Sequence, residues 1–148
     1  NVDYDVIFGP SYKGIPLAAA VATVLNQKAS KKIPICFDRK EEKGHGEGGA
    51  LVGSVKNKKV LIIDDVLTAG TALKNSIKLI QEAGGTISAA LIALDRQEQD
   101  EGEQVSKKLV NELNIPIFSI SNLENLVVYL ETSDKRGIAK KLKASLKS

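Results

Sequence analysis

The sequence contains no methionine, no tryptophan, one cysteine and only 4% aromatic residues. A single cysteine, Cys36, rules out an internal disulfide framework and suits a reducing compartment, so we expect a cytoplasmic protein. So few aromatic side chains argue against a base-stacking surface, and we expect no nucleic-acid partner. No apolar run approaches the roughly 20 residues that span a bilayer, so we expect no membrane association.

The length and charge of the chain are those of one ordinary globular domain. Its 148 residues are 43% hydrophobic and carry a net charge of +3. We therefore expect a single domain over residues 1–148 with a sizeable core. Phosphate ligands explain a mild excess of Lys and Arg as well as nucleic acid does. Because the chain lacks methionine and opens directly ahead of a strand-like run, we expect that an N-terminal portion is missing.

Strand-like and helix-like segments alternate along the chain, which predicts an α/β fold with a mainly parallel sheet flanked by helices. The expected strands are residues 5–8, 33–37, 60–63, 86–94 and 116–120. The expected helices are residues 15–27, 70–83, 103–113 and 122–130. The basic segment 140–148 predicts an amphipathic helix or a frayed tail, and we interpret its lysines as a solvated helix end.

The segment VLIIDDVLTAGTAL, residues 60–73, combines an apolar strand, two acids and a turn of small residues. Its apolar residues predict a strand covered on both faces, with Asp64 and Asp65 at the carboxyl end of that strand. The turn has little side-chain bulk, so its backbone N–H groups can approach an anion. A helix from about Gly70 adds a positive N-terminus beneath that anion. Because the acids can accept hydroxyl groups or a hydrated cation, the segment predicts a site for a sugar phosphate.

The charged loop RKEEKGHGEGG, residues 39–49, contains the lone His45 and four glycines. One interpretation is a mobile lid whose cations enclose a polyanionic leaving group, and the other is a solvated connection. Gly44, Gly46 and Gly49 also form a literal G-x-G-x-x-G. We reject a dinucleotide-binding fold, because charged residues rather than a strand precede these glycines.

Residues 60–73 closely resemble the phosphoribosyl pyrophosphate (PRPP) signature of the type I phosphoribosyltransferases. The resemblance implies the fold of that family, in which the paired acids bind the ribose hydroxyls and the TAGT turn holds the 5′-phosphate. Asp64 and Asp65 would then bind the ribose. The residues that would hold the phosphate are Thr68, Ala69, Gly70, Thr71 and Ala72. The alternative, a chance Asp-Asp at an ordinary strand end, is weaker because strand, acids, turn and helix follow in the required order.

The lid segment, together with GPSYKGIPLA at residues 9–18 and ALDRQE at residues 93–98, resembles the orotate phosphoribosyltransferases of the monofunctional bacterial and yeast kind. The similarity covers about residues 4–131. It implies transfer of the phosphoribosyl group of PRPP to orotate in pyrimidine biosynthesis. It also implies a homodimer in which loop 39–49 acts across the interface. Mg²⁺ would be the cofactor, carried by PRPP and assisted by Asp64 and Asp65, with no other metal ligand from the protein.

The same resemblance assigns roles to individual residues. Ser11, Tyr12 and Lys13 would form a pyrophosphate loop with a cis peptide bond. The lid residues that would grip PRPP are Arg39, Lys40, Lys43 and His45. Thr68 and Arg96 would bind orotate, although a surface ion pair is the alternative for Arg96. The catalytic residues would be Lys43, His45, Asp64 and Asp65.

Two other functions stay open. A type I phosphoribosyltransferase for another base is one, because this family selects its base largely with an N-terminal hood that lies ahead of the first strand here. The lid and the ALDRQE segment favour orotate. The other is a non-catalytic PRPP-sensing regulator that binds nucleic acid, which the small net charge and the intact lid argue against.

Overall fold

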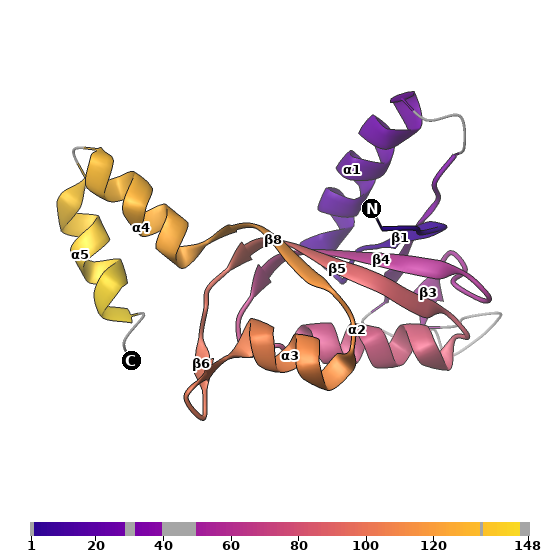
Figure 1. Ribbon diagram of the computed structural model, residues 1–148. Coiled ribbons are helices and arrows are strands. Elements are labelled where there is room, and N and C mark those ends of the chain that lie inside the picture. Colours follow the sequence, from indigo (N-terminus) through magenta and orange to yellow (C-terminus); the bar gives the residue numbers. More distant parts are fainter. Residues whose placement is uncertain (1, 29–31, 40–49, 134, 146–148) are drawn as a thin grey trace.

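A six-stranded sheet forms the centre of the part of the molecule that the structure describes (Figure 1). The computed structural model describes residues 2–28, 32–39, 50–133 and 135–145. The strands lie in the order β3-β2-β1-β4-β5-β8, and only β3 runs antiparallel to its neighbour. Their bounds are β1 Val6–Phe8, β2 Ile35–Asp38, β3 Leu51–Val52, β4 Lys59–Leu67, β5 Thr86–Asp95 and β8 Ile117–Asn122. The expected, mainly parallel sheet is confirmed.

Helices cover both faces of this sheet. α1 lies on one face, and α2 and α3 lie on the other (Figure 1). Their bounds are α1 Gly14–Lys28, α2 Thr71–Glu82 and α3 Val105–Leu113. The parallel strands place their carboxyl ends at one edge of the sheet, so the loops that follow β1, β2, β4 and β5 meet there.

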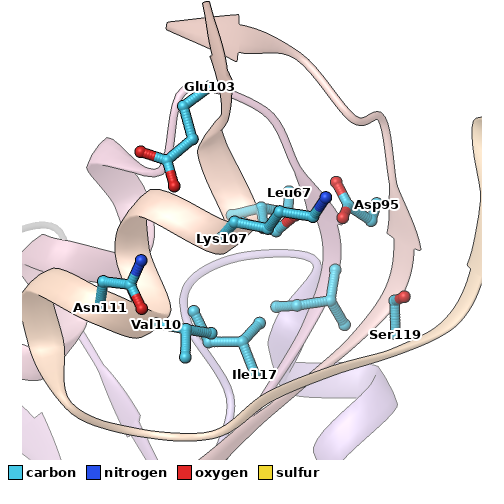
Figure 2. A pocket seen from close by; sticks show the side chains of 10 residues that line it. Leu67, Asp95, Glu103, Lys107, Val110, Asn111, Ile117 and Ser119 are labelled. Atoms are coloured by element: carbon cyan, nitrogen blue, oxygen red, sulfur yellow. The ribbon is translucent and has the colours of Figure 1, made fainter.

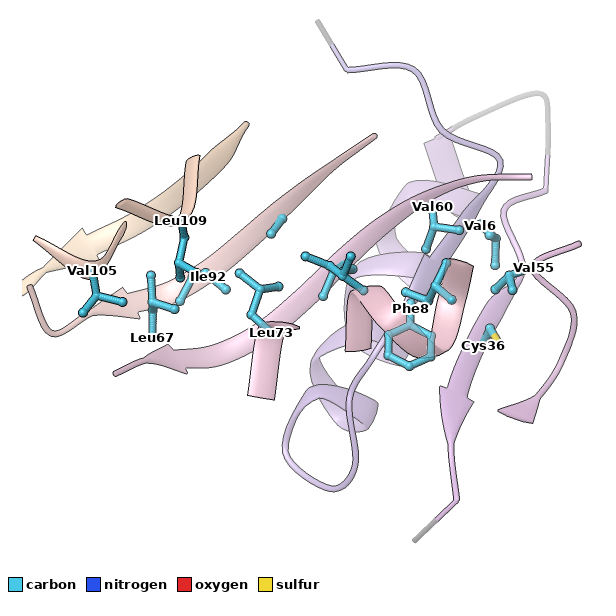
Figure 3. Close-up of a cluster of buried hydrophobic side chains, with 14 residues drawn as sticks. Val6, Phe8, Cys36, Val55, Val60, Leu67, Leu73, Ile92, Val105 and Leu109 are labelled. Carbon is cyan, nitrogen blue, oxygen red and sulfur yellow. The ribbon is translucent and has the colours of Figure 1, made fainter. Parts of the chain in front are cut away.

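The central strand β4 sends alternate side chains into two cores, which explains its continuous apolar sequence. Val60 and Ile62 pack with the cluster formed by α2 and α3, whereas Leu61 and Ile63 pack with α1. Figure 3 shows the first of these clusters, which extends from Val105 to Cys36. Cys36 is fully buried there, and burial raises the pKa of its thiol to about 11, so it packs as an apolar side chain rather than acting as a nucleophile.

Two predicted boundaries are wrong. β4 does not end at the two acids but continues through them to Leu67, because its pairing with β5 persists from Asp64↔Ile92 to Leu67↔Asp95. The expected helix 103–113 begins only at Val105, because β7 Glu103–Gln104 pairs with β6 Gln99–Asp100. Glu101 and Gly102 both have positive φ between these strands, which is the geometry of a tight hairpin turn.

The last two helices form a small unit at one end of the molecule (Figure 1). α4 Leu123–Thr132 begins at Asn122, whose side chain accepts the N–H of Asn125, and α5 Arg136–Ser145 packs against it. Val127, Leu130 and Ala139 form a core separate from the two cores of the sheet. The basic segment is therefore helical as far as residue 145. Among the described residues, no helix is both long and apolar enough to cross a membrane.

Candidate functional site

The turn between β4 and α2 presents backbone N–H groups at the carboxyl edge of the sheet. α2 begins at Thr71, and no side chain among the described residues caps its N-terminus. The first helical hydrogen bond joins the N–H of Lys74 to the carbonyl of Gly70, so the N–H groups before Lys74 lack helical partners. Such donors, at the positive end of a helix, suit a phosphate group.

Gly70 has a backbone conformation that this turn requires. Its φ is +79°, and a Cβ atom built on it would lie 2.5 Å from a methyl carbon of Leu109. Any other residue would therefore both adopt an unfavourable left-handed conformation and collide with α3. The turn is fixed in place by its contact with the core.

Asp64 and Asp65 precede the turn and differ in their surroundings. The backbone N–H of Asp65 donates to Asp64 Oδ1 over 2.8 Å. Partial burial raises the pKa of Asp64 above its ordinary value, and the charge of Asp65 adds to the rise. Asp64 lines a small hollow together with Thr68 and Gly70. The structure therefore brings this predicted acid and the predicted phosphate turn together.

Asp65 is paired with Lys13, which lies just ahead of α1. Lys13 Nζ is 2.8 Å from Asp65 Oδ2, although the lysine side chain is 76% exposed. Burial acts to raise the pKa of Asp65, but the hydrogen bond and charge of Lys13 outweigh it, so that pKa lies below its ordinary value. The same hydrogen bond raises the pKa of Lys13. Lys13 therefore stands at the site as a cation.

The loop that carries Lys13 is anchored at Ser11. The N–H and the hydroxyl of Ser11 donate to the two carboxylate oxygens of Asp38, each over 2.6 Å. The Ser11–Tyr12 peptide bond is cis, as the resemblance implies. Because Asp38 ends β2, this pair of hydrogen bonds joins the loops that follow β1 and β2.

Arg96 follows β5 and lies beside the turn. Its N–H donates to the carbonyl of Leu67 over 3.1 Å, immediately before Thr68. Its guanidinium forms an ion pair of 3.2 Å with Glu98 and is 52% exposed. The expected surface ion pair is thus present, and so is the expected proximity to Thr68.

The loops that follow β1, β2, β4 and β5 therefore meet at one edge of the sheet. They bring together the uncapped N-terminus of α2, the acids Asp64 and Asp65, and the cations Lys13 and Arg96. Residues 2–123 match the family described as the phosphoribosyl transferase domain. The chain belongs to this family. The matched segment contains all the site residues described above. The fold, the sequence signature and the family match therefore all indicate a phosphoribosyltransferase domain.

Individual relatives place the chain among the orotate phosphoribosyltransferases. That enzyme from Pseudoalteromonas translucida is 47% identical over 132 residues, which are 88% of this chain and 62% of that protein. The orotate phosphoribosyltransferase from Francisella tularensis, for which a crystal structure exists, is 38% identical to this chain. The structural match has a TM-score of 0.78 and covers 97% of this chain and 69% of that one. The one from Mycobacterium tuberculosis, solved in complex with PRPP, is 22% identical over 84% of this chain and 66% of that chain. Its TM-score of 0.65 shows a shared fold. The chain thus spans 62% of the length of the curated relative.

Part of the predicted lid lies outside the described residues. Lys40, Lys43 and His45 belong to that part, and their roles stay predictions. Arg39 is described, and its N–H donates to the carbonyl of Ala50 over 2.8 Å. Arg39 and Ala50, the described residues on either side of positions 40–49, are therefore hydrogen-bonded to each other.

Three polar residues at this site escaped the sequence analysis. Asp38 anchors Ser11, while Asp95 and Gln97 are buried on either side of Arg96. The N–H of Gln97 donates to Asp95 Oδ1 over 2.8 Å. A signal was available, because Asp95 and Gln97 lie inside the ALDRQE segment and Asp38 directly precedes the lid. The sequence does not show which of these side chains point inward.

A larger cavity lies beside the predicted site rather than within it (Figure 2). Its volume is about 480 Å³, and α3, β5 and β8 contribute most of its lining. It shares Leu67 and Ile92 with the small hollow that Asp64, Thr68 and Gly70 line. Among the predicted residues, Lys13 and Arg96 have side chains that are more than half exposed, so a ligand can reach them from solvent.

The acids of this phosphoribosyltransferase site suit a magnesium ion that arrives with its substrate. In the described part of the chain, no group of three or more His, Cys, Asp or Glu side chains could hold a metal ion. Mg²⁺ usually keeps several water molecules and takes one or two carboxylates together with substrate phosphates. Asp64 and Asp65 provide two adjacent carboxylates and fit that requirement.

Proposed function

We propose that this chain is the catalytic core of an orotate phosphoribosyltransferase, which forms orotidine 5′-monophosphate and pyrophosphate from PRPP and orotate. The observation that carries the proposal is the convergence of Asp64, Lys13, Arg96 and the uncapped α2 N-terminus at one sheet edge. The known complex of the mycobacterial relative with PRPP supports it. The likeness to the Francisella and Pseudoalteromonas enzymes supports orotate as the base.

The sugar phosphate binds along the β4–α2 turn. The backbone N–H groups of residues 68–72 hold the 5′-phosphate, assisted by the hydroxyls of Thr68 and Thr71. Asp64 and Asp65 accept hydrogen bonds from the ribose hydroxyls. The pyrophosphate lies over Ser11, Tyr12 and Lys13, where Lys13 supplies a positive charge.

The reaction exchanges one bond at C1 of the ribose. N1 of orotate gives up its proton, which ends on the pyrophosphate, and forms a bond to C1 while the bond from C1 to the pyrophosphate oxygen breaks; the bonding electrons of that broken bond leave with the pyrophosphate. Positive charge develops on the sugar and negative charge on the leaving group. Lys13, Arg39 and Lys43 stabilise the leaving group in a site closed to water. Mg²⁺ bound to PRPP supplies further neutralisation of the pyrophosphate charge.

Orotate carries a carboxylate, and Arg96 is the cation that faces it. A guanidinium binds a planar carboxylate through two parallel hydrogen bonds. In the structure, the guanidinium of Arg96 pairs with Glu98. The orotate carboxylate displaces or shares this partner, and the backbone beside Thr68 contacts the pyrimidine ring.

The lid and the oligomer belong to the same proposal. Lys40, Lys43 and His45 reach PRPP from loop 39–49, across the interface of a homodimer. His45 assists proton transfer to the pyrophosphate. The cytoplasm is the proposed location, because Cys36 is a free thiol buried in the core.

The direct test is the loss of orotate absorbance on addition of PRPP and Mg²⁺. Both this 148-residue chain and a form extended at its N-terminus are assayed, with adenine and hypoxanthine as alternative bases. Orotate turnover in either form establishes the enzyme. Turnover with a purine instead, or PRPP binding with no turnover of any base, contradicts the proposal.

Lys43→Ala should lower kcat by about 10²–10³-fold, the effect of removing one group that stabilises developing charge. The fold should stay intact, because a charged loop contributes little to the core. Thermal unfolding and kcat are measured together, with Lys78→Ala on the exposed face of α2 as the control. An unchanged kcat in Lys43→Ala would exclude the lid from the mechanism.

A further inference from the structure

Gln97, the residue after Arg96, is a polar side chain buried in the described structure. Only 6% of it is exposed, and its φ of +54° turns the chain sharply. The proposed chemistry gives Gln97 no contact with PRPP or orotate. A buried amide at this place nevertheless needs hydrogen-bond partners.

Both the backbone and the side chain of Gln97 are hydrogen-bonded to structural elements. Its N–H donates to Asp95 Oδ1, at the end of β5, over 2.8 Å. Its Oε1 accepts the N–H of Glu124, in the first turn of α4, over 2.8 Å. Gln97 therefore joins the turn that carries Arg96 to the N-terminus of a helix 27 residues further along the chain.

Arg96 depends on such support because its side chain extends into solvent. Its backbone N–H is held by the carbonyl of Leu67 over 3.1 Å, and its guanidinium contacts Glu98. A guanidinium makes two parallel hydrogen bonds to a carboxylate only when its direction is fixed. The direction of the Cα–Cβ bond of Arg96 follows from the backbone that Gln97 holds.

We propose that Gln97 is a positioning residue for Arg96. By tying the Arg96 turn to α4, it sets the angle at which the guanidinium meets the carboxylate of the incoming base. This inference rests on the proposed function, because it assigns Arg96 to that carboxylate. It adds a specificity role for α4, which touches neither substrate.

The test compares Gln97→Ala with Asn122→Ala in the form of the chain that turns over orotate. Each substitution removes one hydrogen bond at the N-terminus of α4, but only Gln97 is attached to the Arg96 turn. Gln97→Ala should raise the KM for orotate about tenfold, the range of one lost hydrogen bond. The KM for PRPP and kcat should change by less than about threefold. Asn122→Ala should leave the KM for orotate unchanged.

A second variant and a second measurement separate this inference from the proposed function. Gln97→Glu keeps an acceptor oxygen at the helix N-terminus and should restore most of the affinity for orotate. Amide hydrogen exchange at Arg96, which needs no activity, should be about tenfold faster in Gln97→Ala than in Asn122→Ala.

Each outcome decides a specific statement. Equal effects of Gln97→Ala and Asn122→Ala on the KM for orotate would show that α4 capping alone matters and would overturn the inference. An unchanged KM and unchanged exchange at Arg96 in Gln97→Ala would also overturn it. Absence of orotate turnover in every form of the unmutated chain would overturn the proposed function, and the assignment of Gln97 to orotate binding with it.

Discussion

Asp64 and Asp65 are neighbours in the chain, yet the structure gives their carboxylates opposite electrostatic settings. Burial penalises the charged form of Asp64, whereas Lys13 stabilises the charged form of Asp65. Asp65 forms the ion pair with Lys13, which lies just ahead of α1. The pair therefore combines one acid that is hydrogen-bonded to a cation with one acid whose charged form is disfavoured mainly by burial.

Asp64→Asn and Asp65→Asn should change stability in opposite directions at pH 7. The raised pKa of Asp64 means that its charge disfavours the folded state above the unfolded pKa, so its removal should stabilise the protein. The lowered pKa of Asp65 contributes stability above the unfolded pKa, which is lost as the pH falls through the folded pKa. Asp65→Asn should therefore destabilise the protein slightly, and this loss should vanish in acid. Urea unfolding at pH 7 and pH 3 measures both effects.

Both substitutions should weaken PRPP binding by about 10–100-fold, because a hydrogen bond to a charged group is worth about 1.5–3 kcal/mol. The amide introduced by Asp64→Asn keeps an acceptor oxygen for the N–H of Asp65, so the strand should stay intact. Titration calorimetry with PRPP and Mg²⁺ measures the affinity. Unweakened binding in both variants would remove the acids from the ribose site.

Asp38 anchors the loop of Ser11 that the proposed function assigns to the pyrophosphate. Asp38→Ala leaves the N–H and hydroxyl of Ser11 without their partner, so the loop should lose its fixed conformation. The KM for PRPP should rise about tenfold, consistent with loss of one or two hydrogen bonds. Asp3→Ala, which removes an exposed carboxylate paired with Lys59 at the far end of β4, is the control. Equal KM values for the two variants would contradict this role.

At the scale of elements, the turn between β4 and α2 is positioned by its contact with a side chain of α3. Gly70 lies directly against Leu109, and both belong to the side of the sheet that buries the larger core. A displacement of α3 would therefore move the N-terminus of α2, which the proposed function places under the 5′-phosphate. The position of the turn therefore depends on a residue of α3 as well as on β4 and α2.

Gly70→Ala should destabilise the protein by about 3 kcal/mol, the sum of a left-handed conformation and an overpacked contact. Gly102→Ala is the matched control, because its φ is +84° but a Cβ there meets no atom within 4 Å. It should cost only about 1–2 kcal/mol. Denaturant unfolding gives both free energies, and a cost for Gly70→Ala no larger than that of Gly102→Ala would show that the contact with Leu109 does not matter.

Within the described residues of the whole molecule, the hydrophobic core is divided. Two clusters on the faces of the sheet support the site, and a third holds α4 and α5 together. α4 contacts the rest of the molecule mainly at β8 and at the hydrogen bond from Glu124 to Gln97. The α4–α5 unit can therefore open while the sheet stays folded.

Leu130→Ala should test this division by weakening the smallest core. Loss of a buried leucine side chain costs about 2 kcal/mol or more, and here the cost should fall on α4 and α5. Amide hydrogen exchange should accelerate in those two helices and stay unchanged in β4 and β5. Uniform acceleration across all of these elements would mean that the molecule unfolds as one unit.

The sequence by itself determined the order of elements and indicated the candidate ligand-binding groups. Alternation of apolar strands with amphipathic helices predicts the parallel sheet, and residues 60–73 place two acids and a small-residue turn in one short segment. These features depend on neighbouring residues, whose relative positions are fixed by local geometry. The two wrong boundaries, at the end of β4 and at the start of α3, depend on features that these local patterns do not contain. The extension of β4 to Leu67 depends on pairing with β5, and the short hairpin before α3 depends on two positive φ angles.

Only the tertiary structure decided which polar side chains support the site. Asp38 meets Ser11, and Gln97 meets Glu124, in each case across 27 residues of sequence. The carbonyl of Leu67 meets the N–H of Arg96 because β4 and β5 end at the same level. Such contacts follow from strand order and side-chain direction, which no short segment contains. The candidate ligand-binding residues could therefore be proposed from local sequence, whereas the residues that hold them in position became visible only in the fold.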